Sequence, residues 1–372
     1  MSRPYLIAAI TGRALAQSAA RRGHSTVVLD CFADRDTRAA ATQARAVVGM
    51  RSVRLDARAL LAAAAALAPP GGYAGVVYGA GFEGRPDLLA RLARGGRLCG
   101  NAPETVSQVR DPARFFPLLR KLGIRHPEVR FAPPARPSGW LVKDPGGAGG
   151  AQVRHARRGR ARAGCYYQRF EPAETLSAIF LANGERARVL GFNRQWSTPA
   201  RPGRPFLYGG AVSGVALPPA MEADLSARLD TLVAATGLVG LNGLDFLRRG
   251  DEWLALEVNP RPTATMDLYD ADYGEGLFTL HLQACEGALP EALAPRAAVR
   301  AHAVFYASTF GRVGGDVEFP AWCRDIPHPG FRFAPGVPVC TVHAEAADHD
   351  AALALLRQRL ARLESALIEK GA

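Results

Sequence analysis

Short apolar runs alternate with helix-like segments along the first hundred residues. Strands are predicted at four of these runs, "YLIAAIT", "STVVLD", "GVVYGAG" and "GRLCGN". Helical patterns lie between the first three runs, at residues 13–22 and 57–68, and the second ends at a Pro-Pro-Gly-Gly stretch. Strand and helix alternating in this order predict a parallel sheet with covering helices. We place it in a first domain at residues 1–108.

The middle of the chain changes to an antiparallel pattern. A helical segment runs from Pro103 to Gly123, with Asp111 predicted as the N-cap of a helix opened by Pro112. A proline-rich stretch at residues 125–138 then marks a change of unit. Four strand patterns follow, separated by glycine-rich or charged turns: "GWLVKDP", "CYYQRF", "TLSAIFLANG" and "RARVLGFNRQW".

The remaining elements define two further units. A helix at 220–235 leads into "GLNGLDFLRRGDEWLALEVN", which predicts a hairpin, and a helix follows at 277–286. The last eighty residues contain strand patterns "AHAVFYAS" and "VPVCTVHAEA" and a helix at 349–369. We therefore expect a second domain at 109–290, with subdomains at 109–165 and 166–290, and a C-terminal α+β segment at 291–372.

The predicted hairpin brings two carboxylates together. Period-two alternation groups Leu241, Gly243, Asp245 and Leu247 on one face of the first strand, and Trp253, Ala255, Glu257 and Asn259 on one face of the second. A three-residue loop, Gly250 to Glu252, would place Asp245 opposite Glu257. Opposed like charges are destabilising, and a divalent cation removes the conflict. Two carboxylates and the Asn259 amide oxygen suit Mg²⁺, with Mn²⁺ as the alternative metal. The competing interpretation is a hairpin whose polar face lies in water.

Two further groups point to a nucleotide. Lys143 is followed by a glycine-rich turn that includes Gly146, Gly147, Gly149 and Gly150. Such a turn lets backbone N–H groups approach phosphates, while the lysine supplies a point charge. In "YYQRFEPAETL", Glu174 could accept the hydroxyls of a ribose, although a solvated glutamate at a strand end is the alternative.

Composition narrows the class of protein. No apolar run reaches the length of a membrane span and no signal-peptide cleavage site is present, so we expect a soluble, cytoplasmic protein without membrane association. The six cysteines are dispersed and are interpreted as small buried residues.

The net charge of +12 is compatible with binding to nucleic acid or to acidic and phosphorylated small molecules. The dense cluster Arg154 to Arg162 lacks interleaved aromatics. It therefore predicts a solvated loop, or a loop closing over phosphates, and no nucleic-acid partner.

In their order and spacing, these groups resemble the ATP-grasp superfamily. The resemblance rests on Lys143 with its glycine turn, on "YYQRF" with Glu174, on Asp245 and on "LEVNPRP", and it covers roughly Arg110 to Glu286. It implies an N-terminal parallel α/β (pre-ATP-grasp) domain, followed by an ATP-grasp fold of two α+β subdomains. It also implies ATP and Mg²⁺ as cofactors and an ADP-forming ligase that makes a carbon–nitrogen bond through an acyl-phosphate.

The resemblance also implies roles for individual residues. Lys143 contacts the nucleotide phosphates and the loop Gly146–Gly150 covers them. The hinge residues Gln168, Arg169 and Phe170 lie beside adenine, Glu174 holds the ribose, Asp245, Glu257 and Asn259 bind magnesium, and Arg261 steadies the acyl-phosphate. Two positions depart from the family pattern. Many members of the family carry an Asp-Lys pair in the helix before the grasp, and its lysine is the second cation that contacts phosphate. This chain has Asp111-Pro112 at that position, so Arg110 or Arg114 would take the place of the lysine. Many members of the family have a glycine in the hinge, where this chain has Ala173.

The second substrate is predicted from weaker signals. A glycine-rich turn between strands, Tyr208 to Ser213, contributes Tyr208 and Gly209 to the predicted pocket. Asp267, with Asp270 and Asp272, could hold a substrate ammonium, against helix capping or a solvated loop. Segments near both ends of the chain resemble an ATP-grasp branch linked to one-carbon cofactor (methanofuran and tetrahydromethanopterin) genes, and tyramine–glutamate ligases. The resemblance implies that glutamate is joined to an amine such as tyramine, with tyrosine, a pterin side chain or a polyglutamate chain left open as acceptors.

Other classes of protein compete with this interpretation. A carboxylase subunit would use the same fold, although no biotinyl-carrier segment is seen. A nicotinamide oxidoreductase is disfavoured because the first strand is followed by the single Gly12 and no G-x-G-x-x-G. A basic nucleic-acid-binding protein is the third class. The expected partners are a small-molecule acid and amine. A homodimer is compatible with the sequence.

Overall fold

The computed structural model describes residues 3–49, 52–67, 71–158, 164–295, 298–315 and 317–369. Three parts of the sequence predictions lie outside these ranges: residues 159–162 of the arginine cluster, the prolines at 69 and 70, and residue 68 at the end of the second predicted helix.

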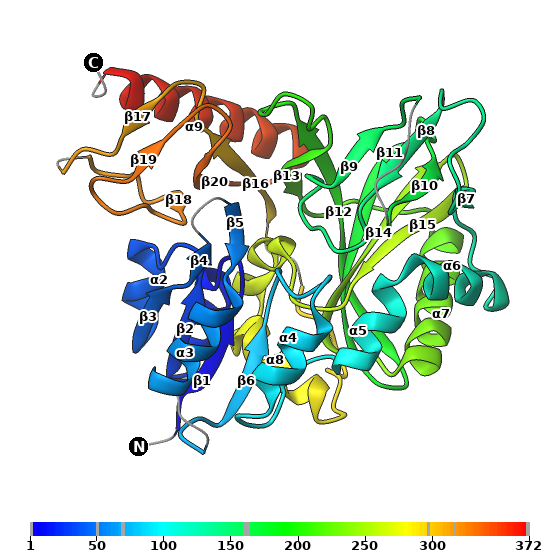
Figure 1. Ribbon diagram of the computed structural model, residues 1–372, viewed down its shortest axis with the longest axis horizontal. Helices are drawn as coiled ribbons and strands as arrows, with labels where there is room; N and C mark the ends of the chain where they lie inside the picture. Colours follow the sequence, from blue (N-terminus) through cyan, green and yellow to red (C-terminus); the bar gives the residue numbers. More distant parts are fainter. Residues whose placement is uncertain are drawn as a thin grey trace.

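A four-stranded parallel sheet forms the N-terminal domain, as predicted (Figure 1). Its strand order is β3-β2-β1-β6, with β1 Tyr5–Ala8, β2 Thr26–Asp30, β3 Gln43–Ala46 and β6 Gly75–Tyr78. The surrounding helices are α1 Arg13–Ala20, α2 Arg35–Ala40, α3 Ala57–Leu67 and α4 Pro86–Ala93. A two-stranded ribbon, β4 Val48–Gly49 and β5 Ser52–Leu55, follows β3.

The edges of this sheet differ from the prediction. The segment "GRLCGN" makes only one parallel bridge, from Leu98 to Val76, and is therefore not a full strand. The fourth strand is β3, whose sequence "QARA" lacks an apolar run and is largely exposed. An edge strand needs no apolar residues on both faces, so hydrophobic patterning does not reveal it.

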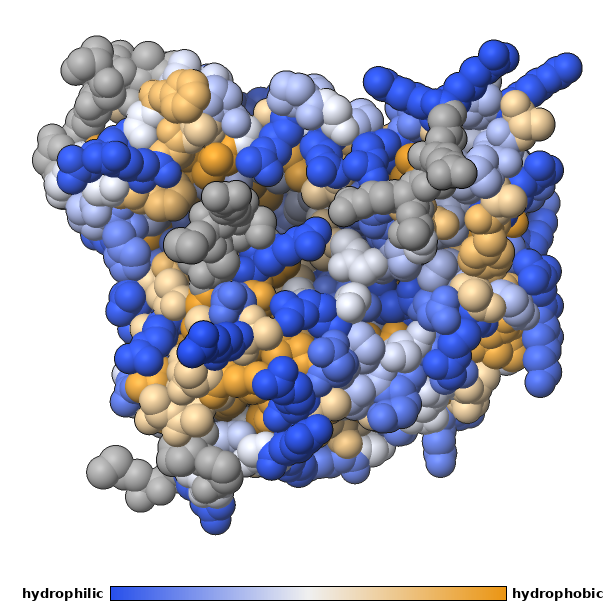
Figure 2. Space-filling model, in the orientation of Figure 1, coloured by the Kyte–Doolittle hydropathy of each residue, from blue (hydrophilic) through white to orange (hydrophobic). Residues whose placement is uncertain are grey.

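Two helices and a small sheet open the second domain. α5 Pro103–Arg110 and α6 Pro112–Lys121 are separated by Asp111, whose side chain accepts a 2.9 Å hydrogen bond from the backbone N–H of Ala113. The predicted N-cap is therefore confirmed. The antiparallel sheet has the order β7-β10-β8-β9, with β7 Val129–Arg130, β8 Trp140–Lys143, β9 Val153–His155 and β10 Tyr166–Arg169. Hydrophilic side chains project around this sheet, at the upper right of Figure 2.

A large sheet of eight strands forms the body of the molecule. Its order is β15-β14-β11-β12-β13-β16-β20-β18. The strands are β11 Glu174–Asn183, β12 Ala187–Thr198, β13 Leu207–Val212, β14 Val239–Arg249, β15 Glu252–Asn259, β16 Val299–Tyr306, β18 Cys323–Arg324 and β20 Pro338–Ala346. β13 pairs with β16, so the sheet continues across residue 290, where the sequence places a boundary. A further pair, β17 Gly311–Arg312 and β19 Arg332–Phe333, lies outside it.

Helices pack against the large sheet and hold the domains together. Buried residues of α6 and α7 Pro219–Thr236 share one apolar cluster with residues of β14 and β15. A second cluster joins α8 Gly276–Cys285 to β11 and β14, and also to α1 and β1 of the N-terminal domain. α9 His349–Glu369 packs on β16 and β20. This shared core fixes the N-terminal domain beside the large sheet.

The cysteines agree in part with the expectation drawn from composition. Four of the six cysteines, Cys31, Cys99, Cys323 and Cys340, are buried. Among the described helices, none is both long and apolar enough to cross a bilayer.

Candidate active site

Asp245 on β14 lies directly opposite Glu257 on β15, as the sequence predicts. The route to this register differs from the expected three-residue loop. Arg249 pairs with Glu252, so the turn contains only Gly250 and Asp251, and Gly250 has φ +59°. A bulge in β15 between the partners of Asp245 and Phe246 then restores the pairing, because Phe246 faces Ala255 while Asp245 faces Glu257.

The bulge also corrects the predicted faces of β15. Trp253 and Ala255 belong to the apolar cluster that includes Phe246, on the side of α7. The prediction that they share a face with Glu257 was therefore wrong. The extra residue in the bulged strand reverses the alternation and turns Glu257 toward Asp245. A bulge of this kind re-aims a side chain without changing the strand's core residues.

Polar groups surround the opposed carboxylates. Asp245 accepts hydrogen bonds from Gln195 Nε2 and from Asn259 Nδ2, each at 3.0 Å. The Asn259 amide oxygen accepts from Arg261 Nη2 at 3.1 Å. Burial and the charge of Glu257 raise the pKa of Asp245. The pair therefore carries the electrostatic conflict that a bound cation would relieve.

Two buried cations face Glu257. Arg110, the last residue of α5, lies with Nη1 3.0 Å from Glu257 Oε2, and its Nη2 donates to the Gly147 carbonyl at 3.0 Å. Lys143, at the end of β8, is only 8% exposed and lines the same small crevice as Arg110 and Glu257. Burial opposes ionisation of Glu257, but Arg110 and Lys143 outweigh it and lower the pKa of that carboxyl. Arg114 is exposed, so Arg110 is the arginine that the fold brings to the site.

The glycine turn after Lys143 packs between two parts of the molecule. A Cβ on Gly146 would lie 2.9 Å from the Cα of Gly84, in the N-terminal domain. A Cβ on Gly150, whose φ is +74°, would lie 1.7 Å from the Phe206 carbonyl oxygen. Only glycine fits this approach of backbone to backbone. The loop therefore packs against both the N-terminal domain and the start of β13, beside the crevice that Lys143, Asp144, Pro145 and Gln152 line.

The predicted hinge residues point in different directions. Gln168 on β10 is 1% exposed, and neither Oε1 nor Nε2 of its amide has a partner among the described residues. The Arg169 guanidinium instead lies over the Trp140 ring, 5.6 Å from its centroid. Phe170 is partly exposed, with its ring 5.6 Å from that of His155. A buried amide without partners is costly, so Gln168 provides an unfilled donor and acceptor at this position.

Glu174 begins β11 and already has a cationic partner. Its Oε2 lies 2.5 Å from Nη2 of Arg248 on the neighbouring strand β14. A ribose held by this carboxylate would share it with Arg248.

Arg261 has a partner that the sequence does not suggest. Its Nε lies 2.5 Å from Oε1 of Glu83, in the loop after β6, and its Nη1 donates to the Pro262 carbonyl at 3.1 Å. Glu83 was missed, although an acid after a glycine-ended parallel strand is a signal, because binding residues gather at the carboxyl ends of such strands. Tyr78 Oη and Asn101 Nδ2 each donate to the Pro260 carbonyl, at 2.9 Å. The N-terminal domain therefore fixes the end of the hairpin.

Tyr208 and Gly209 lie on strand β13, so the predicted glycine-rich turn at this position was wrong. The close approach of β13 to Trp196 and to the His302 carbonyl requires small residues there, which explains the two glycines. The Tyr208 hydroxyl lies 2.6 Å from His302 Nε2. His302 is buried and Tyr208 is half-buried, and burial raises the pKa of the tyrosine, with Asp245 and Asp267 adding to the effect.

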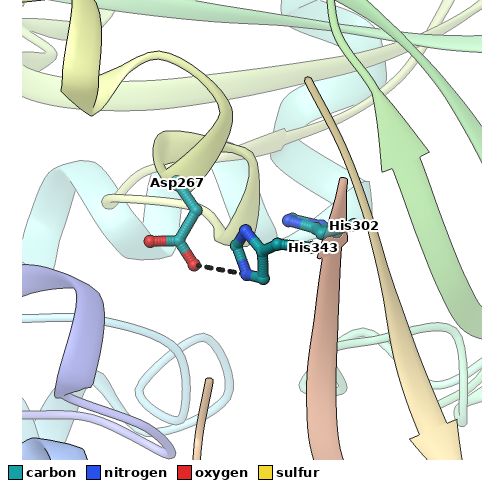
Figure 3. Close-up of side chains that lie close together, drawn as sticks. All are labelled: Asp267, His302 and His343. Atoms are coloured by element: carbon teal, nitrogen blue, oxygen red, sulfur yellow. Dashed lines mark ion pairs between the residues drawn. The ribbon is translucent and has the colours of Figure 1, made fainter. Parts of the chain in front are cut away.

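The three acids after the hairpin have separate partners. Asp267, in the 3-10 turn η1 Ala264–Leu268, forms a two-pronged pair with Arg13, one prong of which measures 2.8 Å. Asp270, in η2 Asp270–Asp272, accepts from Ser18 Oγ at 2.6 Å, and Asp272 pairs with Arg300 at 2.8 Å. Asp270 and Asp272 therefore serve the packing of α1, α8 and β16, which contradicts a shared ammonium site for all three acids. Asp267 instead faces His343 and His302 (Figure 3), two residues that sequence reasoning missed.

Comparison with known proteins identifies the middle of the chain. Residues 109–265 match the family model described as an ATP-grasp domain. Over 252 residues the chain is 26% identical to the large chain of carbamoyl phosphate synthase from Rubrobacter xylanophilus, which covers 60% of this chain and 23% of that protein. The chain thus spans less than a quarter of the length of this relative.

Solved structures share the whole architecture. The biotin carboxylase domain of 2-oxoglutarate carboxylase from Hydrogenobacter thermophilus, a dimer in complex with MgADP, ADP and bicarbonate, has a TM-score of 0.75 at 13% identity, covering 96% of this chain and 90% of that one. An L-amino acid ligase from Bacillus licheniformis has a TM-score of 0.71 at 15% identity, covering 96% and 98%. N5-carboxyaminoimidazole ribonucleotide synthetase from Thermus thermophilus has a TM-score of 0.69 at 18% identity, covering 98% of both chains. The predicted fold is therefore confirmed.

Proposed function

We propose that this chain, an ATP-grasp enzyme that uses ATP with Mg²⁺, is an ADP-forming carboxylate–amine ligase. One arrangement supports the proposal above all others. Beside the glycine loop, the buried cations Arg110 and Lys143 lie near the opposed carboxylates Glu257 and Asp245. The two cations can bind phosphate oxygens, and the carboxylate oxygens beside them can bind a hard divalent ion. Together they suit a nucleotide with bound magnesium.

We assign the nucleotide contacts as follows. Lys143 and Arg110 bind phosphate oxygens, and the loop Gly146–Gly150 covers them. The orphaned amide of Gln168 meets the adenine edge, with Arg169 and Phe170 completing the hinge, and Glu174 holds the ribose beside Arg248. Asp245 and Glu257 provide metal ligands, and Asn259 joins them once its amide turns its oxygen away from Arg261.

Arg261 has both a structural and a chemical role in this assignment. Three of its N–H groups bind Glu83, Pro262 and Asn259. Because a guanidinium carries five donors, Nη1 and Nη2 each keep one N–H for the acyl-phosphate. Glu83 holds this arginine in place and is therefore a positioning residue.

The chemistry explains why so many charges converge. A carboxylate is a poor electrophile, and Mg-ATP supplies a phosphoryl group that converts it into an acyl-phosphate, which an amine attacks with release of phosphate. The residues of this chain stabilise the negative charge that develops during transfer and fix the reacting groups in line. The glycine loop excludes water, which protects the mixed anhydride from hydrolysis.

For the substrates, we propose glutamate and a tyramine-like amine, in the synthesis of a methanofuran-type one-carbon cofactor. The similarity to an L-amino acid ligase over nearly the full length of both chains supports an amino acid as acid substrate. A net charge of +12 suits an acidic substrate. The resemblance of both terminal segments to the cofactor-linked branch supports the pathway. Tyr208, Gly209 and Asp267 would border the second-substrate pocket, in a cytoplasmic enzyme that forms a homodimer.

A carboxylase-type reaction is the second candidate function. The similarity to the biotin carboxylase domain that was solved with MgADP and bicarbonate favours it. Bicarbonate would replace the amino acid as the oxyanion that is phosphorylated. A nicotinamide oxidoreductase or a nucleic-acid-binding protein would not be expected to contain an ATP-grasp domain, and we set both classes aside.

The test is ADP release from Mg-ATP with matched substrate sets. One set contains glutamate with tyramine and related amines, and the other contains bicarbonate with the same amines. We expect a glutamyl amide by mass spectrometry together with ADP. ADP release that requires bicarbonate and yields no amide of glutamate would support the carboxylase-type reaction instead.

Variants test the site independently of the substrate. Lys143→Ala and Glu257→Gln should abolish ADP release while circular dichroism stays native. Lys121→Ala and Glu252→Gln are matched controls, because Lys121 is exposed on α6 and Glu252 lies at the exposed start of β15. Full activity in either site variant would overturn the assignment.

A further inference from the structure

A second cluster of ligating side chains lies apart from the phosphate crevice. Asp267 comes from η1, His302 from β16 and His343 from β20, and one ligand atom of each lies within 4.8 Å of the others. The two histidines are direct partners across the β16–β20 pair, and their ring centroids are 5.5 Å apart. Figure 3 shows the rings lying together beside the Asp267 carboxylate.

Two ring nitrogens in this cluster have no hydrogen-bond partner. Within the described part of the chain, His302 Nδ1 and His343 Nε2 are buried and unpaired. His302 is 1% exposed, so bulk solvent does not reach its ring. Asp267 Oδ2 lies 3.7 Å from His343 Nε2, which is too long for a hydrogen bond. Buried polar atoms are nearly always paired, so these nitrogens indicate a missing ligand.

Charge around the cluster is unbalanced toward the negative. The Arg13 guanidinium lies 3.1 Å from Asp325 and 3.9 Å from Asp36, in addition to its two-pronged pair with Asp267. Three carboxylates therefore surround one guanidinium. A bound dication would reduce this excess of negative charge.

We propose that Asp267, His302 and His343 bind a divalent transition metal, with Zn²⁺ as the first candidate, separately from the Mg²⁺ of the nucleotide. Two imidazole nitrogens and one carboxylate oxygen are the ligand set of many zinc sites that keep a position open. Ligand atoms in a tetrahedral zinc site lie about 3.3 Å apart, given bond lengths of about 2.0 to 2.1 Å. The 3.7 Å between Asp267 and His343 is already close to that separation.

Outer contacts support these ligands. Arg13 donates to both oxygens of the Asp267 carboxylate. The Tyr208 hydroxyl lies 2.6 Å from His302 Nε2, which leaves Nδ1 as the available nitrogen. Such partners orient metal ligands and select the ring nitrogen that binds. If the proposed ligase function holds, the open position would face the second substrate beside Tyr208. The metal site itself does not depend on that function.

Metal analysis of the full chain tests the proposal. Chelator-treated protein is given Zn²⁺ in excess Mg²⁺, dialysed, and measured by inductively coupled plasma mass spectrometry. We expect one zinc per chain in the unmodified protein and less than about a tenth of that in the His302→Gln/His343→Gln variant, since one ligand of three remains. His24→Gln is the control, because His24 contacts Tyr5 and Phe278 and lies outside the cluster. Tyr208→Phe should weaken zinc binding about 10- to 100-fold.

Cobalt identifies the ligands. Cys323 and Cys340 are neighbours in the same sheet and would give a thiolate-to-cobalt charge-transfer band, whereas the proposed site gives only d–d bands. The proposal is wrong if the unmodified protein retains no more zinc than the double variant, or if the cobalt spectrum shows thiolate ligation. It is also wrong if tyramine, without metal, raises the melting temperature of the unmodified protein but not of the double variant, since the cluster is then an amine pocket. If the double variant does not fold, Asp267→Asn with a native near-ultraviolet spectrum replaces it. Mg-ATP binding in the same variants reports separately on the nucleotide site.

Discussion

Arg261 Nε lies 2.5 Å from Glu83 Oε1, and this contact joins the end of the β14–β15 hairpin to the N-terminal domain. Both side chains are almost completely buried. Burial opposes ionisation of Glu83, but Arg261 and Arg110 outweigh it and keep the pKa of that carboxyl below its usual value. Because Arg261 also binds the Asn259 oxygen, the pair connects the first domain to a predicted magnesium ligand.

Replacing Glu83 by Gln should destabilise the protein by about 3–5 kcal/mol, because removal of one partner leaves a buried guanidinium without its counter-ion. The measurement is urea unfolding of the full chain. Glu286→Gln is the matched control: its pair with Arg97 lies on the surface, with both side chains at least 50% exposed, and should cost less than about 1 kcal/mol. Equal losses in the two variants would show that burial of the Arg261 pair adds nothing.

Arg110 and Arg114 can be separated by parallel substitutions. Arg110→Ala should lower kcat/KM about 10- to 100-fold, since it removes a buried cation 3.0 Å from Glu257 and two hydrogen bonds to the loop carbonyls of Pro145 and Gly147. Arg114→Ala should change kcat/KM less than about twofold, because its side chain is exposed. Steady-state ADP release at varied ATP decides between them. A larger effect of Arg114 would reverse the assignment of the second phosphate cation.

Local patterns predicted that Asp245 and Glu257 lie opposite each other, but they did not predict how the hairpin brings the two together. The spacing within one hairpin placed Asp245 opposite Glu257, but the bulge in β15 was not predicted. Two errors cancelled, because a turn one residue shorter than expected and one extra strand residue give the same register. Hydrophobic alternation does not indicate a bulge, since it depends on how β15 packs against α7 and bends at its end.

Contacts between distant segments were beyond the sequence. Glu83 meets Arg261 across 178 residues, and Asp267 meets Arg13 across 254. A lone acid in a loop has no pattern that names its partner, and isolated histidines on apolar strands are most simply interpreted as core residues. Tyr208 was assigned to a turn because two glycines follow it. In the structure these glycines accommodate Trp196 and the His302 carbonyl within a sheet.

Gln168→Leu should separate binding from stability. The native amide is buried without partners, so its replacement by an apolar side chain of similar volume should leave the unfolding free energy unchanged or raise it by about 1 kcal/mol. The same change should raise the KM for ATP about tenfold or more, because a polar edge of the ligand would lose its hydrogen bonds. Thermal melts without nucleotide and kinetics with varied ATP measure the two effects. A clear loss of stability with unchanged KM would mean that Gln168 has a structural role.

His281 should make the protein sensitive to mild acid. Its Nδ1 accepts from the Leu241 N–H at 2.9 Å, which holds the neutral ring between β14 and the Cys99 carbonyl. Burial lowers its pKa to about 4. The pKa of this histidine in the unfolded chain is about 6.5. At pH values between the two pKa values, His281 is protonated in the unfolded chain but neutral in the native state, so the free energy of unfolding falls as pH decreases. The neutral His281 ring contributes about 3 kcal/mol to the free energy of unfolding. This contribution is fully present above pH of about 7 and is lost as the pH falls through that interval.

Urea unfolding at several values between pH 7 and 4.5, for the unmodified protein and His281→Gln, isolates this residue. The slope of unfolding free energy against pH should be smaller in the variant by about 1.4 kcal/mol per pH unit, because one linked proton is removed. Other buried histidines contribute equally to both proteins and cancel in the difference. Proton NMR provides a direct check, since the His281 ring signals should not shift between pH 7 and 5.5. A ring that titrates with an ordinary histidine pKa, or slopes that coincide, would contradict the buried neutral state and its role in fixing β14 against the N-terminal domain.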